Sequence, residues 1–128
     1  DRALLVVGFA GAFRRSELVA LDISDLERRE EGILVSVRRS KTDQEGGGRQ
    51  VPLPYGKDRH TCPVAALDDW VLAAELHEGP LFLAVDRHGH LGRRLTPASV
   101  NLIVKAAAQR AIAGYEAMVA RYPERKAA

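Results

Sequence analysis

The feature that most constrains this chain is a pair of arginines that interrupts an apolar segment close to the N-terminus. Residues 3–10 are apolar apart from one glycine, and Arg14 and Arg15 follow after a short Gly-containing stretch. Glycine weakens a helix at this point, whereas Leu18 and Leu21 resume an apolar face at helical spacing. We therefore predict two packed helices joined by a turn, with the arginines anchored at the junction and their tips pointing outward.

Arg14 and Glu17 stand three residues apart, which places them close together on a helical surface. At this spacing the carboxylate can steer the guanidinium group. The same spacing is also common in surface ion pairs that contribute little to stability. Spacing alone therefore leaves two interpretations open, a positioned functional arginine and an ordinary surface pair, of which the second is the more common.

An antiparallel hairpin is predicted after this region. Residues 33–38 alternate and are rich in β-branched side chains, and residues 49–54 form a returning strand whose prolines place it at an edge. Between them, residues 40–48 contain three consecutive glycines, which favour a flexible loop. Lys41 stands where the first strand enters this loop. Taken alone, a lysine in such a position is more often a solubilising charge than a functional group.

The rest of the chain alternates between helical patterns and turns. We predict a polar loop over residues 27–31, a helix over 62–74, a short buried segment over 81–85, a turn-rich loop over 86–94 and a helix from Thr96 to about Gly114, followed by a further helix or a tail over 115–122. The predicted fold class is α+β, mainly helical, with helices packed around a small antiparallel sheet of two or three strands.

Composition restricts the class of protein. The chain has 128 residues, of which 46% are hydrophobic and 28% charged, as in a globular domain or part of one. Its longest apolar run, residues 3–13, is too short to span a bilayer, so no membrane partner is expected. Cys62 is the single cysteine, which excludes an internal disulfide and fits a reducing cytoplasm.

Charge and histidine patterns exclude some sites and leave others open. The net charge of +2 does not by itself indicate a nucleic-acid-binding protein. His88 and His90 lack the ligand spacing of structural zinc, so we interpret them as part of a polar turn and predict no metal. The glycines at 46–48 are not followed by the Lys-Ser/Thr and helix of a nucleotide-binding loop.

Resemblance to a known family favours a functional role for the arginine pair. Residues 11–18 read Gly-Ala-Phe-Arg-Arg-Ser-Glu-Leu, which resembles the first arginine motif of the tyrosine recombinase (phage integrase) family. That motif runs small residue, Gly, apolar residue, Arg, any residue, Ser or Gly, Glu, Leu. The resemblance implies that Arg14 is the catalytic arginine and that Glu17 is its supporting acid. Ala12 departs mildly from the family pattern, because glycine is usual at that position.

Later segments match the family in the right order. Ser-Lys-Thr around Lys41, followed by the strand ending Val-Pro-Leu, resembles the hairpin that carries the family's catalytic lysine. The Cys-Pro-Val-Ala-Ala-Leu segment starting at Cys62, the Gly-Pro-Leu-Phe segment starting at Gly79 and the helix over 95–108 resemble integrases as well. The similarity extends to about residue 111. Each motif alone is weak, whereas the series together is specific.

The resemblance implies a chemistry that suits the residue types. A tyrosine attacks a DNA phosphodiester without a metal or cofactor, so protein cations must stabilise the charge on phosphorus. An arginine fork matches phosphate oxygens and never deprotonates, whereas a lysine can release a proton to the leaving oxygen. By resemblance, Arg14 and Lys41 take these two roles, and contacts to the DNA backbone come from Arg38, Arg39 and Arg49. The implied partners are duplex DNA and other recombinase protomers.

The family pattern is incomplete in this sequence. No His-x-x-Arg motif follows the helix that starts at Thr96, and Tyr115 and Tyr122 come too early to be the nucleophile. We therefore expect residues 1–128 to be the N-terminal part of a recombinase catalytic domain that neither cleaves nor joins DNA alone. The alternative is a non-catalytic DNA-binding or protein-interaction module on the same scaffold.

Overall fold

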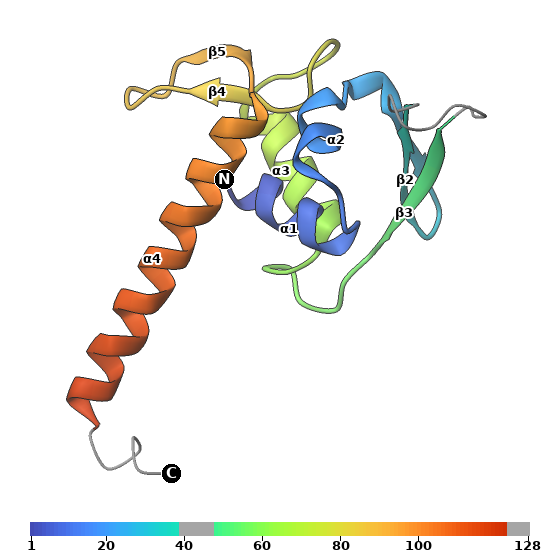
Figure 1. The fold of residues 1–128 in the computed structure, drawn as a ribbon. Helices are drawn as coiled ribbons and strands as arrows, with labels where there is room; N and C mark the ends of the chain where they lie inside the picture. Colours follow the sequence, from blue (N-terminus) through green and yellow to red (C-terminus); the bar gives the residue numbers. More distant parts are fainter. Residues whose placement is uncertain (39–47, 123–128) are drawn as a thin grey trace. The chain divides into compact units, whose positions relative to one another are not determined.

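The computed structural model describes residues 1–38 and 48–122, and the chain divides into two units, Asp1–Pro97 and Ala98–Ala128 (Figure 1). The first unit contains, in chain order, α1 (Arg2–Ala10), α2 (Arg15–Ala20), the 3-10 turn η1 (Ile23–Asp25), β1 (Leu26–Arg29), β2 (Gly32–Val37), β3 (Arg49–Pro54), α3 (Pro63–Ala73), β4 (Leu83–Val85) and β5 (Leu91–Arg94). Helix α4 (Pro97–Arg121) starts at the last residue of this unit and forms the described part of the second. These elements confirm the predicted α+β class.

The predicted hairpin is the centre of a three-stranded antiparallel sheet with the order β1-β2-β3. Val35 of β2 pairs with Leu26 on one side and with Val51 on the other. Alternate residues of β2 point to one face of the sheet, and Ile33, Val35 and Val37 are all buried there. The predicted alternation is therefore confirmed.

The core of the first unit lies between this sheet and the helices. Figure 1 shows α1 and α3 side by side, and α3 also contacts β3. The buried apolar side chains of this unit are Ala3, Leu4, Val7, Leu18, Val19, Leu21, Ile33, Val35, Val37, Leu53, Cys62, Val64, Ala66, Leu67, Leu81 and Phe82. The short helix α2 packs closely on α1, since a Cβ atom added at Gly8 would lie 3.1 Å from Leu18 Cδ1.

The predicted turn between α1 and α2 is a Schellman motif. Ala12 N–H donates to Phe9 O at 3.2 Å, and Phe13 N–H donates to Gly8 O at 3.1 Å. This motif requires a left-handed residue just after the helix, and Ala12 has φ 51. Glycine adopts that conformation without a steric cost, which gives a physical reason for the glycine of the family pattern at this position.

Ala12→Gly is expected to stabilise the protein. Removing the Cβ relieves the left-handed strain of about 1–2 kcal/mol, and the greater freedom of glycine in the unfolded chain offsets part of it. We expect a net gain of about 0.5–1 kcal/mol in the free energy of unfolding, measured by urea denaturation. The matched control is Ala10→Gly in the last helical position of α1, which should cost about 1 kcal/mol. A destabilised Ala12→Gly variant would contradict this assignment of the turn.

Three predicted boundaries are wrong. The polar stretch 27–31 is not all loop, because β1 occupies most of it as a charged edge strand paired with β2. The stretch 86–94 includes β5, which pairs with β4 across a turn closed by Asp86. Helix α4 continues past Gly114 to Arg121, because its alanine-rich flanks outweigh the cost of about 1 kcal/mol for one glycine. In the part of the chain that the structure covers, no helix has the length and apolar character needed to cross a membrane.

Candidate functional site

The candidate site centres on Arg14, which precedes the first turn of α2. Its backbone N–H donates to Glu17 Oε1 at 2.8 Å, and its carbonyl accepts from Leu18 N–H at 3.0 Å. Glu17 is the third residue of the helix, so its carboxylate satisfies a donor that the helix leaves unpaired. The main chain of Arg14 is thereby fixed, while the residue itself is exposed.

Glu17 makes a second contact that joins α2 to the sheet. The residue is only 9% exposed, and its carboxylate accepts from both terminal nitrogens of Arg49, with Nη2 3.1 Å from Oε1. The Arg49 guanidinium holds the pKa of the Glu17 carboxyl below its usual range, and Glu17 in turn raises the pKa of Arg49. The spacing suggested that Glu17 steers the Arg14 guanidinium. In the structure it holds the Arg14 backbone and the Arg49 side chain.

Sequence reasoning missed the Glu17–Arg49 pair. The two residues are 32 positions apart, and no local pattern links them. Arg49 was predicted to contact the DNA backbone, and the structure places it at the start of β3 with part of its guanidinium occupied by Glu17. A pairing between residues so far apart in the sequence can be identified only from the tertiary structure, in which β3 lies beside α2.

Arg38 holds the opposite end of α2. It directly follows β2, and its guanidinium donates to the carbonyl of Ala20, the last residue of the helix. Its Nη2 also lies 3.4 Å from Asp22 Oδ2 and 3.3 Å from Asp25 Oδ2. A cation at a helix C-terminus is favourable because it complements the exposed carbonyls. Arg38, predicted to contact DNA, is therefore engaged with acidic and backbone oxygens of its own chain.

Arg94 at the end of β5 completes this arrangement. Its Nη1 donates to Val19 O at 2.9 Å and to Leu21 O at 3.2 Å, and its Nη2 pairs with Asp22. The Arg94 guanidinium keeps the pKa of the Asp22 carboxyl below its usual range. In the sequence, Arg94 falls in a stretch predicted as a turn-rich loop and was given no role. In the structure Arg94 fixes the helix that follows Arg14.

Two predicted site residues, Arg39 and Lys41, lie outside the described residues, so their roles stay predictions. The described flanks of this segment are close together. Gly48 has φ 77, and a Cβ added there would lie 1.9 Å from Val37 O. Only glycine fits this approach between the end of β2 and the start of β3. The base of the hairpin is therefore well defined.

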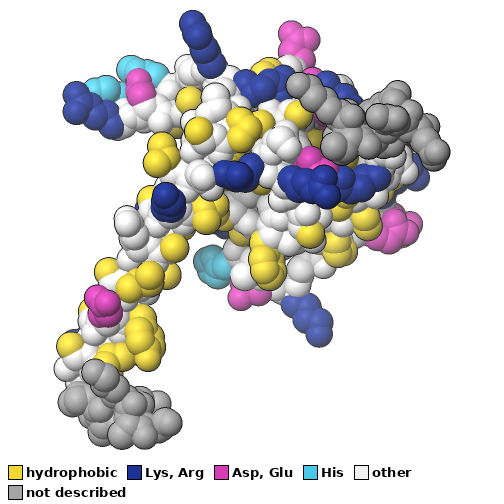
Figure 2. All heavy atoms as spheres, viewed as in Figure 1, with side chains coloured by type: hydrophobic (Ala, Val, Ile, Leu, Met, Phe, Trp, Pro, Cys, Tyr) yellow, Lys and Arg dark blue, Asp and Glu magenta, His cyan; other side chains and the backbone are white. Residues whose placement is uncertain are grey.

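Basic side chains gather around this region. Figure 2 shows Lys and Arg side chains in a row across the first unit, in the region between α2 and the sheet in Figure 1, with acidic atoms directly against the row. Carboxylates of this unit pair with Arg38 and Arg49. Positive charge beside a fixed, exposed arginine is suited to binding a phosphate backbone.

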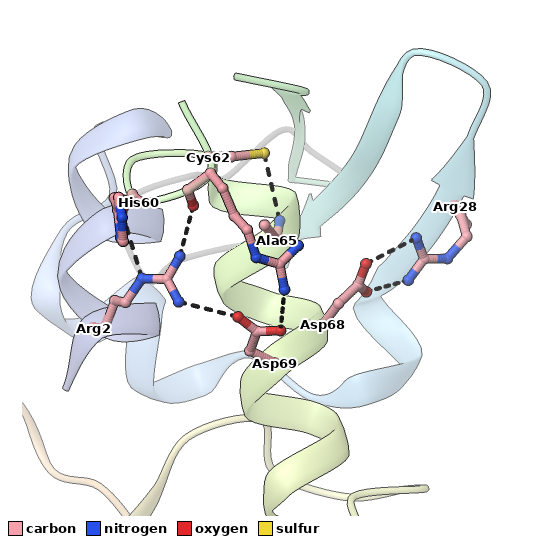
Figure 3. A network of polar contacts seen from close by, with 8 residues as sticks. Arg2, Arg28, His60, Cys62, Ala65, Asp68 and Asp69 are labelled. Carbon is pink, nitrogen blue, oxygen red and sulfur yellow. Dashed lines mark hydrogen bonds and ion pairs between the residues drawn. The ribbon is translucent and has the colours of Figure 1, made fainter. Parts of the chain in front are cut away.

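A second polar network holds α1, and with it the turn before Arg14. Figure 3 shows the Asp69 carboxylate of α3 beside the guanidinium of Arg2, with Asp69 Oδ2 3.1 Å from Arg2 Nη1. Arg2 also donates to the carbonyls of Arg59 and His60. These contacts tie the start of α1 to α3 and to the preceding loop.

His90 is paired with an acidic residue of its own hairpin. His90 and Arg93 have His-x-x-Arg spacing, but they belong to the β4–β5 hairpin before α4, and His90 Nδ1 lies 3.2 Å from Asp86 Oδ2. Within residues 1–38 and 48–122, no three or more His, Cys, Asp and Glu side chains are grouped to hold a metal ion.

The comparisons with known proteins agree with the family resemblance of the motif series. The chain is homologous to part of the tyrosine recombinases, as its arginine motif predicted. It is 43% identical over 106 residues to an integrase/recombinase XerD homologue of Selenomonas ruminantium, covering 82% of this chain and 31% of the relative. It is 35% identical over 114 residues to the tyrosine recombinase XerC of Pseudomonas aeruginosa, covering 86% of this chain and 32% of the relative.

A tyrosine recombinase of Synechococcus elongatus is also 35% identical over 119 residues, covering 85% of this chain and 31% of the relative. The chain thus spans about a third of the length of these curated relatives. No family model matches the chain.

Proposed function

We propose that residues 1–128 are part of a tyrosine-recombinase catalytic domain and bind the scissile phosphate of duplex DNA. The observation that carries this proposal is Arg14, an exposed arginine whose main chain is locked by Glu17 at the start of α2. An arginine fork can donate two parallel hydrogen bonds to phosphate oxygens, and a fixed main chain lowers the entropic cost of placing that fork. The names of the relatives and the order of the motifs support the same class.

The proposed reaction of the parent protein is a transesterification. A tyrosine oxygen bonds to phosphorus while the bond from phosphorus to O5′ breaks, which leaves a 3′-phosphotyrosine. Arg14 stabilises the negative charge on the phosphate oxygens, and Lys41 passes its proton to the departing O5′. Arg38 and Arg39 are proposed to approach neighbouring phosphates, whereas Arg49, for which the resemblance implied the same contact, is paired with Glu17. No residue of this chain is assigned as the nucleophile, and we propose that residues 1–128 alone do not cleave DNA. The cytoplasm is the proposed compartment, since Cys62 is a free thiol.

Salt-dependent binding tests this proposal. The purified chain should bind a short DNA duplex, and the logarithm of its affinity should fall linearly with the logarithm of salt concentration, with a slope of about −3 to −5 for three to five neutralised phosphates. A nicked substrate that traps phosphotyrosine should yield no covalent adduct. Absence of duplex binding at low salt would favour the protein-interaction alternative, and a covalent adduct would refute the proposed inactivity.

A further inference from the structure

The base of the β2–β3 hairpin is attached to α2 at the end where Arg14 lies. Arg49 is the first residue of β3 and pairs across the sheet with Val37, the last residue of β2. Glu17 is the third residue of α2. The Glu17–Arg49 pair therefore bridges a helix and a sheet that are separate in sequence, directly beside the exposed arginine of the proposed site.

Glu17 and Arg49 form a bidentate ion pair in which the carboxylate is buried. The Glu17 side chain is 8% exposed, whereas that of Arg49 is 48% exposed. Both carboxylate oxygens accept from Arg49. Bidentate contacts between arginine and a carboxylate fix orientation as well as distance. Because the carboxylate faces the Arg49 guanidinium, much of the positive charge of Arg49 is already compensated within the chain.

One carboxylate oxygen connects Arg49 to Arg14. Glu17 Oε1 accepts from Arg49 Nη2 at 3.1 Å and from the backbone N–H of Arg14 at 2.8 Å. The Arg49 guanidinium and the Arg14 main chain therefore share one acceptor oxygen. Glu17 accepts from one N–H of each terminal nitrogen of Arg49, so a direct phosphate contact would have to use the remaining donors.

We propose that Glu17 and Arg49 are a coupled pair of positioning residues that hold Arg14 in its phosphate-binding geometry, with Arg49 acting through Glu17 rather than by contact with DNA. This inference rests on the proposed DNA-binding function. It replaces the predicted contact of Arg49 with the DNA backbone by a role for which positive charge alone is insufficient, since the planar fork is needed. It also assigns Glu17 a favourable effect on DNA affinity despite its negative charge.

Whether Glu17→Gln raises or lowers the DNA affinity distinguishes a direct phosphate contact by Arg49 from a role in positioning Arg14. If Arg49 contacts phosphate directly, neutralising Glu17 frees Arg49 and removes a negative charge near the DNA, so affinity should rise. If the pair positions Arg14, the same substitution should weaken binding. Glutamine keeps the size of the side chain and an oxygen that can accept from Arg14 N–H, so α2 retains its cap.

The experiment measures duplex affinity at fixed salt for the wild-type chain, Glu17→Gln, Arg49→Gln and the double variant. We expect each single substitution to weaken binding about fivefold to tenfold, and the double variant to bind no more weakly than Arg49→Gln alone, because coupled residues are not additive. The control is Arg28→Gln. This substitution removes the β1 arginine that pairs with Asp68 of α3, and it should change affinity less than twofold.

Arg49→Lys provides a conservative test if Arg49→Gln folds poorly. A lysine keeps the positive charge but not the fork, so a positioning role predicts a loss as large as that of Arg49→Gln, whereas a phosphate contact predicts an intermediate loss. Tighter binding by Glu17→Gln, or additive losses in the double variant, would overturn the inference.

If the wild-type chain binds no duplex, the proposed function fails, and an NMR readout then decides the positioning role separately. The backbone amide signal of Arg14 should shift similarly in Glu17→Gln and Arg49→Gln, but not in Arg28→Gln. An Arg14 amide unaffected by Arg49→Gln would refute the coupling.

Discussion

Replacing Leu67 with alanine is expected to lower the free energy of unfolding by about 2–5 kcal/mol, a large part of the stability of a small domain. Leu67 lies on α3 and is only 1% exposed. This helix contacts both α1 and β3, so its buried face joins the helical part of the core to the sheet. Removal of the side chain leaves a cavity that the surrounding residues only partly fill.

The same helix offers a matched control. Leu72→Ala makes the identical chemical change at a side chain that is 80% exposed, and it should alter stability by less than about 0.5 kcal/mol. Urea denaturation of both variants, followed by circular dichroism, gives the two values. Equal losses would mean that α3 does not bury the face that contains Leu67.

The second large effect is expected at Arg14. Arg14→Ala should lower the affinity for duplex DNA about tenfold or more at fixed salt, since a charge-assisted hydrogen bond contributes about 1.5–3 kcal/mol. Circular dichroism should be unchanged, because the residue is exposed and its backbone contacts to Glu17 and Leu18 do not need the side chain. Arg14→Lys should be intermediate, because it keeps the charge and loses the fork.

Lys57→Ala is the control for charge alone. It removes one exposed cation from the loop between β3 and α3 and should weaken binding less than twofold. If Arg14→Ala and Lys57→Ala lose DNA affinity equally, binding depends on overall positive charge, and Arg14 makes no specific phosphate contact.

Local patterns were sufficient to predict much of this fold. The glycine-weakened end of α1, the alternation in β2 and the proline at the first position of α3 each act within a few residues, and the structure confirms the elements they indicate. Arg14 was singled out by the resemblance of its contiguous motif to a family, since its spacing to Glu17 alone favoured an ordinary surface pair. Elements whose stability depends on a partner were missed. The sequence of β1 is charged and polar, and it is a strand only because β2 supplies its hydrogen bonds.

The supporting contacts of the candidate site could not be predicted from the sequence. Arg38, Arg49 and Arg94 look alike in a charge pattern, yet each binds a different part of α2 or its flank. Arginine has several donors and a long reach, so its partner is set by tertiary structure rather than by its neighbours in sequence. The left-handed conformation of Ala12 could not be predicted from the sequence either, because alanine usually indicates a helix.

The most direct measurement of the central claim is an NMR titration of the 15N-labelled chain with a short DNA duplex at low salt. We predict that the backbone amide signals of residues 13–17 and 48–50 shift most, because they surround the fixed Arg14 and the base of the hairpin. Signals of the Arg2–Asp69 network on the α1–α3 side should change little. Shifts spread evenly over the chain, or confined to the β4–β5 hairpin, would contradict the placement of a phosphate-binding site at Arg14.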